Sequence, residues 1–218
     1  RTAATGVRVL SRGRFFKHKK KTRALRLRNW KARGFGRIYK VSERSARRID
    51  RRLESFTKVG VDSGATSDIV VSLTAFPERI PERKYSLYSL LTQSLKPQRV
   101  VLWLAKEQFP SGEGDIDESV LRLRDNGLEI RWTSDIRSYK KLVPALRHFP
   151  DKLIVTADAD IFYPRAWLTL LYEESAKTPH ARRVYVHKVF SLRLDSGGGV
   201  APFKTWPQGG RATPSLLT

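Results

Sequence analysis

A short apolar run that ends in two carboxylates constrains the fold of this chain more than any other feature. Residues Leu153 to Thr156 are apolar or β-branched, and Asp158 and Asp160 follow almost directly. Such a run predicts a buried strand, and a buried strand cannot hold unpaired carboxylates. We therefore expect both aspartates at the carboxyl end of the strand, which is the edge where open α/β sheets bind ligands.

Two aspartates that flank one small residue can serve two purposes. Their oxygens can hold a hard divalent cation such as Mg²⁺ or Mn²⁺, which takes its remaining ligands from water and from substrate phosphates. They can also cap the helix that follows, because Pro164 suits a first helical turn. A pair of this kind often arises by chance, so the rest of the chain has to decide between the two interpretations.

Further apolar strands alternate with amphipathic helices along the chain. The apolar character of residues 99–104 is continuous, as in a strand that is covered on both faces. Alternation with short connections predicts an α/β fold with a doubly wound, mostly parallel sheet flanked by helices. We expect strands at 68–74, 99–104, 128–132, 152–156 and 184–187, and helices at 83–93, 115–126 and 139–149 and after Pro164.

Basic residues are concentrated at the beginning of the chain. Residues 1–60 contain 21 Lys and Arg against 3 Asp and Glu, whereas the remaining residues contain 22 against 18. The spacing of apolar residues within this basic extension predicts a helix over 42–58. We expect a small-residue linker at 61–67, an α/β domain at 68–195 and a Gly/Pro-rich tail at 196–218.

The basic extension allows three interpretations. It can be a solvated tail, or its cations and interleaved aromatic side chains can contact phosphates. Those phosphates would belong to an anionic membrane surface, reached through residues 1–58, or to nucleic acid. We rank nucleic acid last of the three.

Three absences from the sequence limit the class of protein. No run approaches the ~20 apolar residues that a membrane span needs, and the lack of Cys excludes Cys-ligated zinc. The chain has no Met and begins at Arg1, so we expect an internal or processed piece of a longer product. We expect a cytoplasmic protein, or one bound peripherally at the inner face of the membrane.

Four segments in this order resemble the successive landmarks of bacterial family-two-like glycosyltransferases. They are residues 72–80 (SLTAFPERI), 86–94 (SLYSLLTQS), 139–146 (YKKLVPAL) and 156–164 (TADADIFYP). The resemblance spans about residues 68–190 and implies a GT-A, Rossmann-like fold of the nucleotide-diphospho-sugar transferases. It also implies transfer of a sugar from a nucleotide-sugar donor to a hydroxyl group of a glycan or lipid-linked acceptor.

The resemblance assigns roles to individual residues. Thr74 and Ala75 would lie beside the nucleoside of the donor. Asp158 and Asp160 would hold Mn²⁺ or Mg²⁺ on the diphosphate, with Asp158 also among the residues that bind the nucleotide sugar. Close relatives often have a third Asp where this chain has Ala159, so the division of roles between the two aspartates stays open.

Four other polar residues have both a functional and a structural interpretation. Lys140 and Lys141 can neutralise a departing diphosphate, and we count Lys141 among the residues that bind the nucleotide sugar, or the two can form a solvated helix face. Asp135 can bind the base or the ribose, or cap a turn. His187 can be a further metal ligand, or simply a partly exposed residue at the end of a strand.

The catalytic base is not evident in the sequence. In inverting glycosyltransferases a carboxylate deprotonates the acceptor hydroxyl, yet no residue after Asp195 is acidic. We expect the base beyond Thr218, or a piece that is inactive alone. The alternatives are a nucleotidyltransferase, although residues 75–78 (AFPE) are not a Gly-rich phosphate loop, and a basic nucleic-acid-binding protein.

Overall fold

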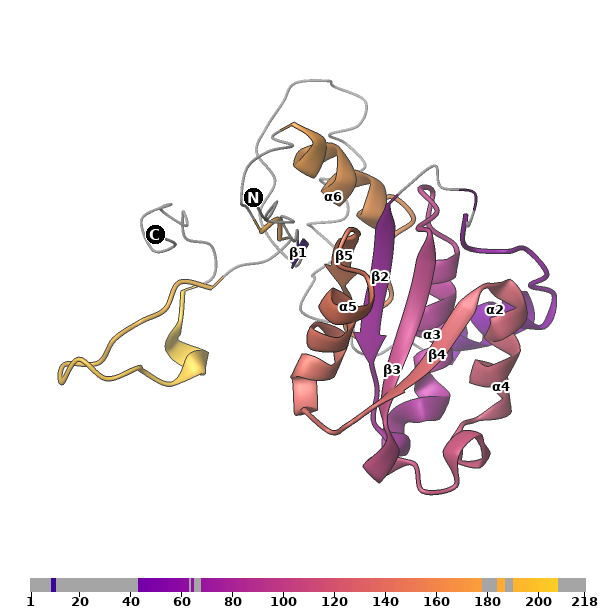
Figure 1. The fold of residues 1–218 in the computed structure, drawn as a ribbon, viewed down its shortest axis with the longest axis horizontal. Helices are drawn as coiled ribbons and strands as arrows, with labels where there is room; N and C mark the ends of the chain where they lie inside the picture. The colour runs from indigo at the N-terminus through magenta and orange to yellow at the C-terminus, as the bar shows by residue number, and fades with distance from the viewer. Residues whose placement is uncertain are drawn as a thin grey trace, which may run out of the picture.

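The computed structural model describes residues 9–10, 43–62, 64, 68–177, 184–186 and 190–207. The described residues form an α/β fold in which helices flank a parallel sheet (Figure 1). The sheet order is β1-β5-β2-β3-β4, with every neighbouring pair parallel. Its strands are β1 (Val9–Leu10), β2 (Ile69–Thr74), β3 (Arg99–Ala105), β4 (Leu128–Thr133) and β5 (Leu153–Thr156). Four of the strands predicted from the sequence are confirmed.

The strand order reverses beside β2. The chain steps from β2 outward to β3 and β4, and it then returns to the other side of β2 as β5. The two central strands are in register, with Val71 opposite Val155 and Ser72 opposite Thr156. The carboxyl ends of β2 and β5 are therefore the topological switch point, where ligands bind in open α/β sheets.

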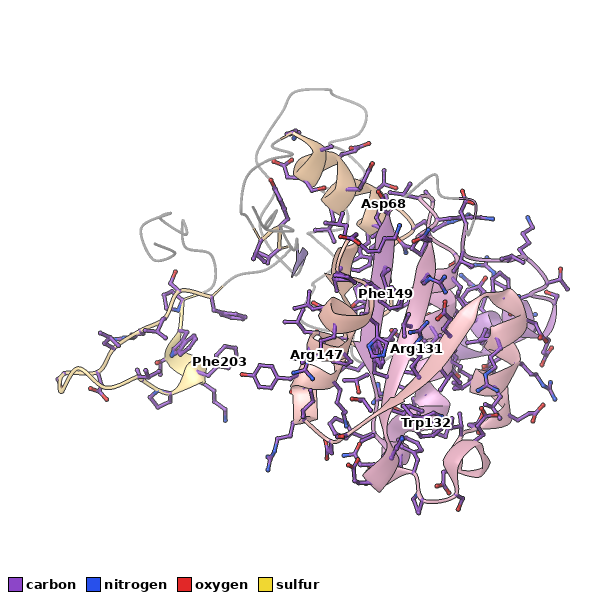
Figure 2. All side chains as sticks on the ribbon, in the orientation of Figure 1. Asp68, Arg131, Trp132, Arg147, Phe149 and Phe203 are labelled. Carbon is purple, nitrogen blue, oxygen red and sulfur yellow. The ribbon has the colours of Figure 1, made fainter. Side chains whose placement is uncertain are left out.

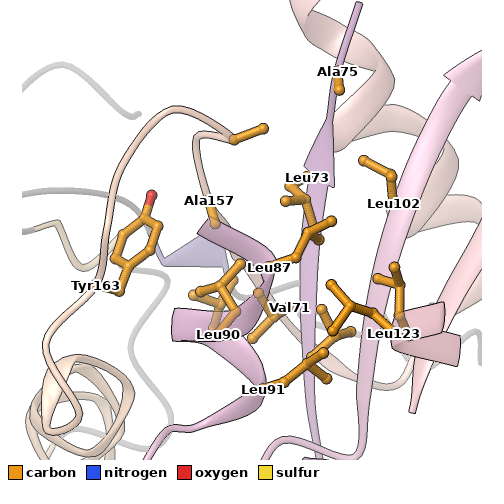
Figure 3. Packing of buried hydrophobic residues seen from close by; sticks show 14 of the residues in the cluster. Val71, Leu73, Ala75, Leu87, Leu90, Leu91, Leu102, Leu123, Ala157 and Tyr163 are labelled. Carbon is orange, nitrogen blue, oxygen red and sulfur yellow. The ribbon is translucent and has the colours of Figure 1, made fainter. Parts of the chain in front are cut away.

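Helices cover both faces of the sheet. The face that carries Val71 and Leu73 packs against α3 and α6, and Figure 3 shows Leu87 and Leu90 of α3 beside Val71. The opposite face carries Val70 and packs against α5. The bounds are α3 (Ile80–Leu91), α4 (Glu118–Leu121), α5 (Val143–His148) and α6 (Trp167–Ala176).

Local signals explain where these helices begin and end. Asp117 caps α4 by accepting a hydrogen bond from the backbone N–H of Ser119 at 2.9 Å. A 3-10 helix continues α4 to Asn126, and Gly127 ends it with a φ of 98°, which glycine adopts readily. The helix predicted over 139–149 is divided into a 3-10 turn and α5, because Pro144 lacks an N–H and suits a first helical turn.

A cation–π contact closes the second face of the sheet. Arg131 of β4 lies over the ring of Phe149, with 4.8 Å between its guanidinium carbon and the ring centroid (Figure 2). Phe149 also packs with Leu142 and Leu146 against the buried residues of this face. The segment that leads into β5 is thus held against this face of the sheet by a contact with β4.

Helix α2 (Glu43–Glu54) lies within the range predicted from the sequence and packs against α3. Ile49 is buried, and Asp50 forms an ion pair with Lys84 of α3 at 2.9 Å. The segment that follows is also held, because the Gly60 N–H donates to the carbonyl oxygen of Asn126 at 2.7 Å. The last third of the basic extension is therefore part of the α/β unit.

The end of the chain departs from the prediction. Val184 and Val186 lie outside any strand, and Tyr185 makes only an isolated bridge, while His187 lies outside the described residues. The side of β5 away from β2 is instead occupied by β1, whose Val9 is opposite Ile154. Farther along, Leu194 and Val200 form an antiparallel bridge. None of the described helices is both long and apolar enough to cross a bilayer.

Candidate functional site

A pocket of about 520 Å³ opens at the carboxyl ends of β2 and β5. One wall is formed by residues 74–76, which are the last residue of β2 and the two that follow it, and the other by residues 157–160, which follow β5. These two segments are distant in sequence and meet because their strands are neighbours in the sheet. The pocket therefore occupies the switch point that the topology identifies.

Five residues singled out from the sequence line this pocket. The Thr74 hydroxyl donates to the carbonyl oxygen of Trp103 at 2.7 Å, which fixes its side chain against β3. Ala75 is almost fully buried beside it. The five residues are Thr74, Ala75, Lys141, Asp158 and Asp160.

The loop with the two aspartates is held through its backbone. The Asp158 N–H donates to the hydroxyl oxygen of Tyr163 at 2.7 Å, and the Ser86 hydroxyl donates to the Asp158 carbonyl oxygen at 3.2 Å. Arg83 donates from Nη1 to the carbonyl oxygen of Ala159 at 3.0 Å. Figure 3 shows Tyr163 on this loop next to α3. These contacts thus fix the backbone of the loop, while Asp158 and Asp160 line the pocket.

A stripe of buried polar residues on α3 and just beyond it supplies these contacts. Besides Arg83 and Ser86, it contains Ser89, which accepts from the Tyr163 N–H at 2.9 Å. It ends at Gln93, which donates to the Pro164 carbonyl oxygen at 3.0 Å. This stripe was not predicted from the sequence, although polar residues spaced by three and four in an amphipathic helix are a signal for it.

Lys141 lies in the pocket and is paired with Asp158. Its Nζ is 2.5 Å from Asp158 Oδ1, and the two side chains are 27% and 34% exposed. The Lys141 carbonyl oxygen accepts from the hydroxyl of buried Ser72 at 2.6 Å, and Ser72 in turn accepts from Trp103 Nε1 at 3.0 Å. A hydrogen bond from the sheet thus positions the backbone of Lys141, through a serine that Trp103 holds in turn.

Lys140 has a different environment and is neither a pocket residue nor part of a solvated face. Its side chain is fully buried, donates to Gln108 Oε1 at 2.7 Å and forms an ion pair with Asp135 at 3.1 Å. Its ammonium also lies 4.8 Å from the ring centroid of Phe76. The prediction of a solvated helix face is therefore wrong for Lys140, because its charge is compensated inside the fold.

Asp135 caps its turn, one of the two roles expected for it, and lies outside the pocket lining. Its Oδ1 accepts from the backbone N–H of Arg137 at 2.9 Å, and Arg137 has a positive φ of 54°. That N–H and the Lys140 ammonium hold the pKa of Asp135 below its usual value. Asp135 is thus engaged by its own turn and by Lys140.

Three carboxylates line the pocket: Glu78, Asp158 and Asp160. Within the described part of the chain, no group of three or more His, Cys, Asp and Glu residues is arranged to hold a metal ion. Two carboxylates suit Mg²⁺ or Mn²⁺, which bind through one or two acidic side chains together with water and substrate phosphates.

Two further pocket residues were not recognised in the sequence. Phe76 is 43% exposed and presents part of its ring, while Ser138 lies on the 3-10 turn that carries Lys141. Only the strand order and the return of the chain over the sheet place them here. Phe76 directly follows the predicted site residue Ala75 in the sequence, whereas no local pattern identifies Ser138.

Comparisons of the chain with models of protein families, with curated proteins and with solved structures found no match.

Proposed function

We propose that this chain is a metal-dependent glycosyltransferase domain of the GT-A type. It would move a sugar from a nucleotide-diphosphate donor to a hydroxyl group of a glycan or lipid-linked acceptor. One observation carries the proposal: the residues that end β2 and the two aspartates that follow β5 share one pocket at the switch point. A nucleotide-diphosphate donor needs one surface for its nucleoside and another for its charged diphosphate, because the two parts are bound by different chemistry.

Asp158 and Asp160 would hold the divalent cation. When bound, Mn²⁺ or Mg²⁺ supplies positive charge to the diphosphate that leaves the sugar. The backbone contacts of Arg83, Ser86 and Tyr163 keep the two aspartates in place. Protein groups fixed in this way stabilise developing charge without having to reorganise during the reaction.

Two cations of the protein line the same pocket. Lys141 is partly exposed next to Asp158, and Arg83 is almost fully buried behind Ala159. Cationic hydrogen-bond donors form short, strong contacts with phosphate oxygens. We propose that Lys141 contacts the diphosphate and that Arg83 holds the aspartate loop in position.

The nucleoside would lie against Thr74 and Ala75. The small side chain of Ala75 lets a ligand approach the backbone closely, and the neighbouring Phe76 offers an exposed aromatic face. Of the described pocket acids, Glu78 is the one left without a role toward the cation.

Calorimetry with UDP, GDP and dTDP, each with and without Mn²⁺, tests the proposal. We expect one of these nucleotides to bind only with Mn²⁺, and Asp158→Asn to abolish that binding. Asp151→Asn is the matched control, because Asp151 is exposed at the opposite end of β5. Binding without Mn²⁺, or equal binding by the parent, Asp158→Asn and Asp160→Asn, would contradict the proposal.

A nucleotidyltransferase is the alternative enzyme, and its products distinguish it. Sugar transfer releases a nucleoside diphosphate, whereas nucleotidyl transfer releases pyrophosphate. The loop after β2 contributes Phe76 and the acidic Glu78 to the pocket instead of a Gly-rich turn with basic residues. This loop favours the glycosyltransferase.

A further inference from the structure

We infer that the ion pair between Lys141 and Asp158 is exchangeable and couples cation binding to diphosphate binding. Lys141 pairs with Asp158 until Asp158 binds a cation, and it then turns to the diphosphate. This inference rests on the proposed function and concerns the regulation of the same site. It is carried by three properties of the pair: its position, its exposure and the way its backbone is held.

The backbones of both residues are fixed while their side chains remain partly exposed. Ser72 holds the Lys141 carbonyl oxygen, and Tyr163 holds the Asp158 N–H. The two side chains are 27% and 34% exposed, and both line the pocket. A rotation of the Lys141 side chain therefore breaks the pair without moving the loop or the sheet.

The adjacent lysine shows what a permanent pair looks like in this protein. Lys140 is 0% exposed, and Gln108 and Asp135 both contact its ammonium. Breaking that pair would leave a buried charge without a partner, which is costly. The Lys141 pair is open to water and to ligands, so it can exchange.

Exchange follows from the short distance within the pair. With Lys141 Nζ 2.5 Å from Asp158 Oδ1, a divalent cation on the same carboxylate would lie next to an ammonium and be repelled by it. Lys141 must leave before Asp158 binds a cation fully, and its ammonium then needs another anion. The diphosphate provides one within the pocket. Cation and diphosphate thus favour each other's binding, as linkage requires.

Replacing Lys141 by Met should change two affinities in opposite directions. Without its competitor, Asp158 should bind Mn²⁺ alone about fivefold or more tightly than in the parent, at the low end of measured couplings between sites. The preformed Mn²⁺–pyrophosphate complex should bind more weakly by a similar factor, because its cationic partner is missing. Both affinities are measured by calorimetry on the full chain, and Lys141→Gln is the second variant.

Lys152→Met is the matched control. Lys152 pairs with Asp68 at 2.9 Å at the starts of β5 and β2, whereas the pocket lies at the carboxyl ends of these strands. Neither affinity should therefore change. Thermal unfolding by circular dichroism shows that the variants fold. If Lys141→Met and Lys141→Gln weaken Mn²⁺–pyrophosphate but leave Mn²⁺ alone unchanged, or if neither affinity changes, the exchange is refuted.

Asp158→Asn separates this inference from the proposed function. If Mn²⁺ binding depends on Asp158 but not on Lys141, only the exchange is overturned. If the parent and the Lys141 variants bind no Mn²⁺, or bind it equally well after Asp158→Asn, the metal site and the exchange both fall.

Discussion

Ser72 connects the interior of the sheet to the pocket wall through two hydrogen bonds. It accepts from Trp103 Nε1 and donates to the carbonyl oxygen of Lys141. Ser72→Ala would leave both groups without this partner in a buried place, so we expect a loss of about 1–3 kcal/mol in the free energy of unfolding. Urea denaturation measures it.

Ser55→Ala is the control for that experiment. The Ser55 hydroxyl is exposed, and its backbone acceptors are 3.4 Å away, which is long for a hydrogen bond. The free energy of unfolding should therefore change by no more than about 0.5 kcal/mol. Equal stability of the parent and Ser72→Ala would show that the hydrogen bonds of Ser72 add nothing to the fold.

Arg83 positions the aspartate loop through a hydrogen bond to its backbone. Arg83→Met keeps an unbranched side chain in the same space but removes the donor to the Ala159 carbonyl oxygen. Loss of an outer-shell contact typically weakens metal binding about 10- to 100-fold, and we expect that range for Mn²⁺. Calorimetry measures the affinity, and Arg83→Lys should restore part of it.

Arg122→Met is the control for Arg83, because Arg122 is exposed and pairs with Glu118 at 3.0 Å. It should leave the Mn²⁺ affinity unchanged. Unaltered Mn²⁺ binding by Arg83→Met would mean that the loop keeps its position without the guanidinium.

At the scale of single residues, the sequence identified residues that line the pocket, but it did not distinguish the roles of Lys140 and Lys141. Lys140 and Lys141 are identical neighbours, and nothing local distinguishes them. They lie on a 3-10 turn, where successive side chains point in directions about 120° apart. One side chain enters the fold and the other enters the pocket. Only the position of the turn on the sheet determines which.

Among the elements, α3 has two buried sides. Its apolar side, with Leu87 and Leu90, packs on the sheet, and this side could be predicted from the spacing of apolar residues. Its polar side, with Ser86 and Ser89, holds the loop after β5. Pattern analysis treats polar positions as solvent-facing, so the second side could not be predicted without knowing that α6 and the loop lie there.

The segment after α2 approaches α3 closely at Gly60. A Cβ atom at this position would lie 2.3 Å from the carbonyl oxygen of Leu91, which belongs to the backbone and cannot move aside easily. We expect Gly60→Ala to destabilise the protein by about 1–3 kcal/mol through overpacking. Thermal or urea unfolding measures the change.

Gly114→Ala is the matched control, since its nearest neighbour would be the Ser111 Cβ atom at 3.5 Å, an ordinary contact. It should have little effect on stability. Equal stabilities of the two variants would mean that the segment moves away from α3 at little cost.

At the scale of the whole molecule, the class of fold and four strands followed from the sequence, but the strand order did not. Alternation of strands and helices predicts a parallel sheet without saying on which side of β2 the chain returns. The return of β5 to the free side of β2 creates the switch point. The aspartates therefore pointed to the correct edge of the sheet, while the pocket depends on a pairing that no local pattern encodes.

The packing of α2 changes where the basic region should be divided for experiments. Residues 1–42 contain 15 Lys and Arg and no Asp or Glu, so their deletion lowers the net charge from +22 to +7. We expect the full chain to bind anionic vesicles with a steep dependence on salt. Residues 43–218 should bind at least about tenfold more weakly.

Vesicle sedimentation over a salt series measures this difference, and neutral vesicles are the control. Equal binding by the two chains would assign the membrane contact to the α/β unit. Tighter binding of the full chain to duplex DNA than to the vesicles would favour nucleic acid as the partner.

The pairing of β2 with β5 also affects how the protein is made. Asp68 and Lys152, which pair at the starts of these strands, are 84 residues apart in sequence, with β3 and β4 between them. Contacts between such distant segments form slowly, because a long loop must close first. During synthesis, the ribosome must release most of the chain before the two walls of the pocket can meet. A nascent chain that is interrupted earlier has a partial sheet with an open edge at β2, which chaperones must protect from aggregation.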